Sequence, residues 1–137
     1  MYGLKTEASF DSAHFLTDYY GKCENLHGHR WRAVVYLEVA DLQADGTMKD
    51  MVVDFGVFKR AVRDLAEELD HTFLVEEGCW PRRRWPPEAE GFSLTVLPFR
   101  TTAENLALRL RPADGAGFPV SQVTCRAQRC AIYRRTA

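Results

Sequence analysis

Two hydrophobic periods divide the chain, and the change between them constrains the fold more than any other feature of the sequence. Residues 4–10 alternate between apolar and polar side chains, and the alternation is stronger over 27–40, where Trp31 and the apolar residues that follow it share one face. A period of two indicates β-strands with one buried face. After Asp54 the period lengthens, and the apolar residues from Val57 to Leu69 form a stripe of about four helical turns. The sequence therefore predicts two strands followed by an amphipathic helix.

The rest of the chain predicts shorter elements. They are a loop over 78–91, a strand over 92–99, a helix over 101–111, a turn over 112–119 and a strand pair over 121–127 and 130–133. Thr101 and Glu104 have the spacing of a capping box that opens the second helix. Because strands and helices do not alternate regularly, the order predicts an α+β fold with a largely antiparallel sheet. We expect one domain spanning residues 1–137.

Charge and composition exclude several function classes. The 18 basic and 19 acidic side chains give a net charge of −1, which argues against nucleic-acid wrapping and against binding to anionic membranes. No apolar run approaches the ~20 residues that a membrane-spanning helix requires. The first residues contain no basic segment followed by an apolar core, so we expect no signal peptide and a cytoplasmic location. The four cysteines are then expected to be reduced, with Cys125 and Cys130 as small core residues.

Three of the four histidines have the spacing of a metal site. His27 and His29 are two residues apart in a predicted strand, so both side chains point to the same face. His14 ends the preceding strand-like segment, where a hairpin partner would supply a third imidazole. Three neutral imidazoles with an open fourth position are typical of a catalytic zinc site. The alternative is that these are packed or surface histidines near a turn.

Cys23 lies four residues before His27 and has two possible roles. As a fourth zinc ligand it would make the site structural. As a thiolate close to the metal it would act as a base or nucleophile. The spacing alone leaves both roles open.

Asp70 and His71 follow the amphipathic helix and form a possible proton-transfer pair. A carboxylate that accepts a hydrogen bond from an imidazole fixes its tautomer and raises its basicity. The alternative is that the two residues serve the end of the helix, where such side chains are common.

The motifs FDSAHFL, GKCENLHGH, MVVDFGVFKR, LDHTFL and LPFRTTAENLA occur in this order. Together they resemble the 6-pyruvoyltetrahydropterin synthase family, and the Cys-x-x-x-His-Gly-His spacing is similar to its bacterial 6-carboxytetrahydropterin synthase branch. The resemblance covers the chain from about Glu7 to Tyr133. It implies the tunnelling fold (T-fold), an antiparallel sheet with two helices on one face, assembled into barrel-shaped trimers or hexamers with active sites between subunits.

The resemblance also implies roles for individual residues. His14, His27 and His29 match the zinc ligands, Cys23 matches the proton-abstracting thiolate, and Asp70 and His71 match the proton relay. The implied substrate is 7,8-dihydroneopterin triphosphate, which loses triphosphate and, in the carboxy branch, acetaldehyde. The product would feed the biosynthesis of deazapurines such as queuosine.

One position departs from the family pattern. The last strand pair of the family carries a glutamate that anchors the pterin ring, whereas Ala127 stands at that place here and the turn is two residues shorter. Losing a carboxylate that accepts two ring N–H bonds should cost on the order of 2–4 kcal/mol in recognition. Gln128 and Glu104 are the remaining candidate substrate-binding residues. A zinc-containing pterin- or purine-binding homologue with an altered substrate or without catalysis is therefore the alternative function.

Overall fold

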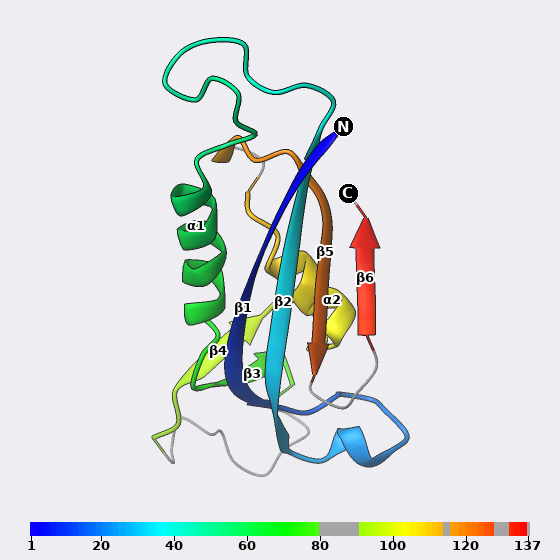
Figure 1. The fold of residues 1–137 in the computed structure, drawn as a ribbon. Coiled ribbons are helices and arrows are strands. Elements are labelled where there is room, and N and C mark those ends of the chain that lie inside the picture. The colour runs from blue at the N-terminus through cyan, green and yellow to red at the C-terminus, as the bar shows by residue number, and fades with distance from the viewer. Residues whose placement is uncertain (80–90, 114–115, 128–131, 137) are drawn as a thin grey trace.

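The computed structural model describes residues 1–79, 91–113, 116–127 and 132–136. A six-stranded sheet in the order β4-β3-β1-β2-β5-β6 carries the two helices (Figure 1). In chain order the elements are β1 (Tyr2–His14), η1 (Lys22–Glu24), β2 (His27–Val39), α1 (Phe55–Glu67), β3 (Thr72–Glu76), β4 (Leu94–Leu97), α2 (Ala103–Arg109), β5 (Val120–Ala127) and β6 (Ile132–Thr136).

The long β1–β2 hairpin is the centre of the sheet. The two strands pair antiparallel from Tyr2↔Val39 to His14↔His27 without a register shift. Even-numbered residues of β1 and odd-numbered residues of β2 face the same side, because successive side chains of a strand alternate. Phe10 stacks on Trp31 across the hairpin, with ring centroids 6.2 Å apart. The two predicted strands are confirmed, and both extend as far as the histidines.

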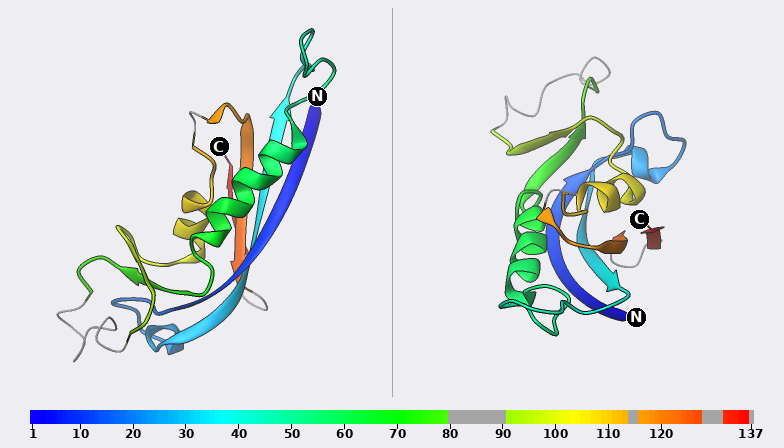
Figure 2. Two further views of the ribbon diagram at one scale, coloured as in Figure 1. Left: turned by 90° about the vertical axis from the view of Figure 1, so that its left-hand side faces the viewer. Right: turned by 90° about the horizontal axis from the view of Figure 1, so that it is seen from above.

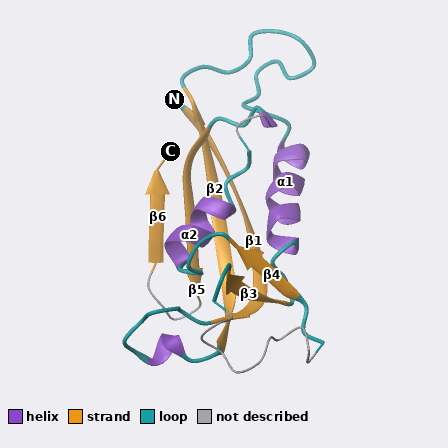
Figure 3. Cartoon of the chain, turned by 180° about the vertical axis from the view of Figure 1, so that it is seen from behind, coloured by secondary structure: helices purple, strands orange, loops and turns teal. Residues whose placement is uncertain are grey.

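Both helices cover this side of the sheet, which we call the inner face (Figure 2, left; Figure 3). Asp54 caps α1 by accepting a hydrogen bond from the Val57 backbone N–H at 2.9 Å. Phe58 and Val62 of α1 share one buried cluster with Leu106 of α2 and with the inward side chains of β2 and β5. The amphipathic helix and the α+β arrangement are therefore as predicted.

Three details of the prediction are wrong. The sequence analysis missed β3, which pairs parallel with β1 and with β4, so the sheet is mixed. β3 has Leu74 in the main core and Val75 in a second cluster beyond the sheet, so two-sided burial erases the alternating pattern. The expected strand over 92–99 is only β4. The second helix begins at Ala103, and its N-cap is Thr102 rather than Thr101.

The prediction of Cys125 as a small core residue is confirmed. Cys23 and Cys125 are free thiols among the described residues. Cys125 is buried in the core, and burial raises the pKa of its thiol to about 12. Cys130 lies outside the described residues. Within the described residues, the helices are too short or too polar to cross a membrane.

Candidate metal centre

The hairpin brings His14, His27 and His29 together on the inner face. His14 pairs directly with His27, and His29 follows two residues along β2. The ring centroids lie 4.6 Å apart for His14 and His27, 5.2 Å for His14 and His29, and 4.7 Å for His27 and His29. One nitrogen from each ring lies within 4.8 Å of the others. This cluster has the three-imidazole composition that a catalytic zinc site requires.

Two of the three imidazoles are held by carbonyl oxygens. His14 Nδ1–H donates to the Thr101 carbonyl oxygen at 2.8 Å and also lies 3.1 Å from the Thr101 hydroxyl. His27 Nδ1–H donates to the Asn25 carbonyl oxygen at 2.6 Å. Since a carbonyl oxygen only accepts, each Nδ1 carries the proton and each Nε2 keeps its lone pair.

The free Nε2 atoms show that the residues fit a metal ion. Those of His14 and His27 are buried, and neither has a hydrogen-bond partner among the described residues. Buried polar atoms are normally satisfied, so unpartnered lone pairs at the centre of a histidine cluster point to an absent ligand. Fixing each ligand through its other ring nitrogen is the usual outer-shell arrangement of metal sites.

The electrostatics favour the neutral form of two of the three rings, His14 and His29. Burial, followed by the nearby His27 and His29 rings, lowers the pKa of His14 to about 4 against one opposing backbone hydrogen bond. Burial and His27 also lower the pKa of His29. Neutral imidazole is the form that binds a metal ion, so folding prepares these ligands for coordination.

Cys23 lies in the loop that joins the two strands of the hairpin. Its side chain is exposed in the short η1 turn, and its carbonyl oxygen accepts from the Leu16 backbone N–H at 2.8 Å. The described residues give Cys23 no place in the metal-ligand cluster. The structure thus offers three protein ligands, and the thiol remains outside them.

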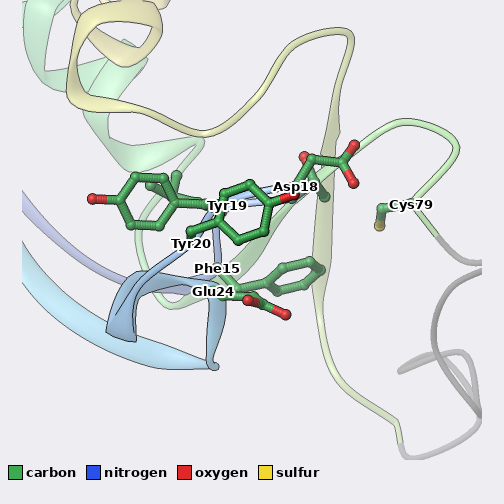
Figure 4. A pocket seen from close by; sticks show the side chains of 8 residues that line it. Phe15, Asp18, Tyr19, Tyr20, Glu24 and Cys79 are labelled. Atoms are coloured by element: carbon green, nitrogen blue, oxygen red, sulfur yellow. The ribbon is translucent and has the colours of Figure 1, made fainter.

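The same loop lines one side of a pocket of about 350 Å³, which Cys79 also lines (Figure 4). The rings of Phe15, Tyr19 and Tyr20 line it together with the Asp18 and Glu24 side chains. Tyr19 packs so closely on Gly21 that a Cβ there would lie 2.8 Å from the Tyr19 ring. None of the three histidines lines this pocket, which is therefore separate from the metal-ligand cluster.

Asp70 and His71 form a pair that does not touch the histidine cluster. His71 Nδ1 lies 2.9 Å from Asp70 Oδ2, and Asp70 Oδ1 accepts from the Asp11 backbone N–H at 2.8 Å. The backbone N–H of His71 in turn donates to the backbone carbonyl oxygen of Asp11 at 2.7 Å. The Asp11 side chain pairs with Arg30 on the outer face of the sheet, away from the helices. Among the described residues, no ring contact or hydrogen bond joins His71 to the cluster.

Asp70 and His71 shift each other's pKa so that each charged form is favoured. The hydrogen bond to Asp70, followed by the Asp70 charge, raises the pKa of His71. The backbone N–H of Asp11 lowers the pKa of Asp70, burial opposes this shift, and the hydrogen bonds and charge of His71 lower the pKa further. The His71 side chain is nevertheless 79% exposed.

The remaining candidates lie around α2 and β5. Glu104 is exposed in the first turn of α2. Ala127 is buried on β5 directly opposite Trp31, and Gln128 lies outside the described residues. Sequence reasoning missed Thr101, which holds His14 from 87 residues away. In the sequence, Thr101 stands at the start of the predicted second helix. That position indicated a helix cap and not a residue that holds a metal-ligating histidine.

Fold and cluster together define a β-sheet protein with two helices on one face and an open three-histidine metal centre. The family described as 6-pyruvoyl tetrahydropterin synthase matches residues 3–127. The chain is 36% identical over 118 residues to a 6-carboxy-5,6,7,8-tetrahydropterin synthase from Haemophilus influenzae, covering 78% of this chain and 77% of that one. This chain therefore belongs to the 6-pyruvoyl tetrahydropterin synthase family.

Solved structures agree on the fold. A crystal structure of an uncharacterized protein from Wolinella succinogenes has a TM-score of 0.73 at 22% identity, covering 98% of this chain and 97% of that one. The 6-pyruvoyl tetrahydropterin synthase of Plasmodium vivax has a TM-score of 0.65 at 21% identity, covering 99% and 98%. The expected T-fold is confirmed by these likenesses.

Proposed function

We propose that this protein is a zinc-dependent lyase that converts 7,8-dihydroneopterin triphosphate to 6-carboxytetrahydropterin with release of acetaldehyde and triphosphate. The observation that carries the proposal is the cluster of three histidines, two of which have a buried Nε2 with no hydrogen-bond partner among the described residues. The name of the Haemophilus influenzae relative supports the carboxytetrahydropterin product. The product would serve deazapurine biosynthesis, and the enzyme would work in the cytoplasm.

Each group near the cluster has a task in this reaction. His14, His27 and His29 hold Zn²⁺, which when bound supplies Lewis-acid polarisation of substrate oxygens. The Cys23 thiolate takes a proton from the substrate side chain at Sγ. Cys23 suits this role because it is exposed and is not one of the clustered ligands.

Asp70 and His71 move the proton at the other face of the substrate. Asp70 Oδ2 holds the His71 Nδ1–H, so His71 Nε2 is the atom that exchanges protons with substrate. Because the pair is exposed and separate from the cluster in its own chain, we propose that it serves the metal centre of a neighbouring subunit. The protein is then a homo-oligomer, a trimer or a hexamer, whose sites lie between chains.

Recognition of the substrate ring is the step in which this chain differs most from its family. Ala127 cannot accept the ring N–H bonds that a glutamate would accept. We propose that Gln128 supplies a carbonyl oxygen and that Glu104, exposed at the start of α2, supplies a second contact.

Incubation of the zinc-loaded protein with 7,8-dihydroneopterin triphosphate tests this function. We expect mass spectrometry to detect acetaldehyde and a carboxylated pterin, and we expect neither from a zinc-loaded Cys23→Ala variant. Binding of the substrate without any product would contradict the lyase and would favour a pterin- or purine-binding homologue.

A further inference from the structure

The three metal-ligating histidines are not held equally. His14 is fixed by Thr101 and His27 by Asn25, each through Nδ1. Within the described chain, no hydrogen bond is recorded for the ring of His29. A ligand whose second nitrogen has no partner is free to rotate, which weakens coordination by the whole set.

Ser12 is the polar side chain placed to supply the missing partner. It is the direct cross-strand neighbour of His29, and both side chains lie on the inner face. Side chains paired in this way have Cβ atoms about 4.5–5.5 Å apart, which is within hydrogen-bonding reach of an imidazole and a hydroxyl. Ser12 is 6% exposed, and its buried hydroxyl has no hydrogen-bond partner among the described residues.

Among the described residues, Trp31 also lies beside His29 on this face, but it cannot take the same role. Trp31 contacts the His29 ring edge-on, with centroids 5.1 Å apart. Its indole nitrogen is also buried without a partner, but an indole N–H only donates. A neutral imidazole that binds a metal through one nitrogen has an N–H at the other and therefore needs an acceptor. The hydroxyl of Ser12 can accept.

We infer that Ser12 is the positioning residue of the third metal ligand: its Oγ accepts a hydrogen bond from the non-ligating N–H of His29 when the metal is bound. This inference rests on the metal centre of the proposed function. Each of the three histidines then has its own acceptor. These are the backbone carbonyl oxygen of Thr101 for His14, that of Asn25 for His27 and the hydroxyl of Ser12 for His29. Ser12 touches neither substrate nor metal and acts only through His29.

The test compares Ser12→Ala with Ser9→Ala. Ser9 lies on the same strand but is exposed on the outer face, so its loss removes a hydroxyl without reaching the cluster. Affinities for Zn²⁺ and Co²⁺ are measured by competition with a chelator, and the unfolding temperature is recorded for each variant. In the zinc-loaded protein, the exchange-protected imidazole N–H signals are assigned by NMR.

We expect Ser12→Ala to bind Zn²⁺ and Co²⁺ about 10-fold more weakly than the wild type and Ser9→Ala to bind them equally well. The unfolding temperature of the metal-free protein should stay unchanged, because the substitution breaks no hydrogen bond among the described residues of the metal-free chain. The N–H signal of His29 should disappear from the Ser12→Ala spectrum while those of His14 and His27 remain.

Wild-type metal affinity and an intact His29 signal in Ser12→Ala would overturn this inference and leave the metal centre standing. Failure of the wild-type protein to bind Zn²⁺ or Co²⁺ would overturn the proposed function as well.

Discussion

The histidine cluster and the Asp70–His71 pair are built in opposite ways. In the cluster, His14 is buried and His27 and His29 are half-buried on the inner face, two rings are anchored to backbone carbonyls, and all three imidazoles come from one chain. The pair is anchored just as firmly, through two backbone hydrogen bonds with Asp11, but its imidazole is exposed. In the proposed function, this exposed imidazole serves the metal centre of a neighbouring subunit. The comparison teaches that the candidate metal ligands all come from one chain, whereas the proposed catalysis needs two.

The largest expected effect is loss of the metal on removing a ligand. His29→Ala leaves two imidazoles, too few to hold Zn²⁺ against water, so bound zinc should fall below about a tenth of one equivalent. Metal content is measured by elemental analysis after dialysis. His71→Ala is the matched control and should keep a full equivalent. A zinc-free His71→Ala protein would show that the two regions are not separate.

Cys23→Ala should remove turnover while the metal stays. A missing proton-transfer group typically lowers rates by about 10²–10⁴-fold. Turnover of 7,8-dihydroneopterin triphosphate and zinc content are measured on the same preparation. Lys22→Ala, on the same exposed turn, is the control and should remain active. Loss of zinc together with activity would make Cys23 a ligand and the site a structural one.

The smallest expected effect is a shift in the titration of His71. Asp70 raises its pKa, so the NMR titration midpoint should lie above the ordinary value of about 6.5 and should fall in Asp70→Asn. The sign follows from linkage: a raised pKa stabilises the folded protein below about pH 6.5, and that contribution is lost as the pH rises through the folded-state value. Glu67→Gln is the control, because Glu67 is the weakest cause of the shift and should change the midpoint little. An unchanged titration midpoint in Asp70→Asn would show that Asp70 does not raise the pKa of His71 and would contradict the pairing of the two side chains.

The sequence predicted the cluster better than it predicted the surroundings of the cluster. Alternation placed His27 and His29 on one face, and the hairpin register brought His14 opposite them. The contact of Thr101 with His14 joins residues 87 apart and depends on where the chain enters α2, which no local pattern records. The strand β3 escaped prediction because a short strand buried on both faces has no alternation. Asp70 and His71 were recognised as a pair, but a sequence contains no sign of which face of the sheet they reach.

Complementation between two inactive variants tests most directly whether catalysis needs two chains. His71→Ala and Cys23→Ala subunits are co-expressed, the mixed oligomers are purified and loaded with zinc, and turnover is compared with that of each variant alone. If Cys23 and His71 of one site come from different chains, random mixing restores about a quarter of the wild-type sites. Activity no higher than the two variants show separately would contradict the account and would place both residues of a site in the same chain.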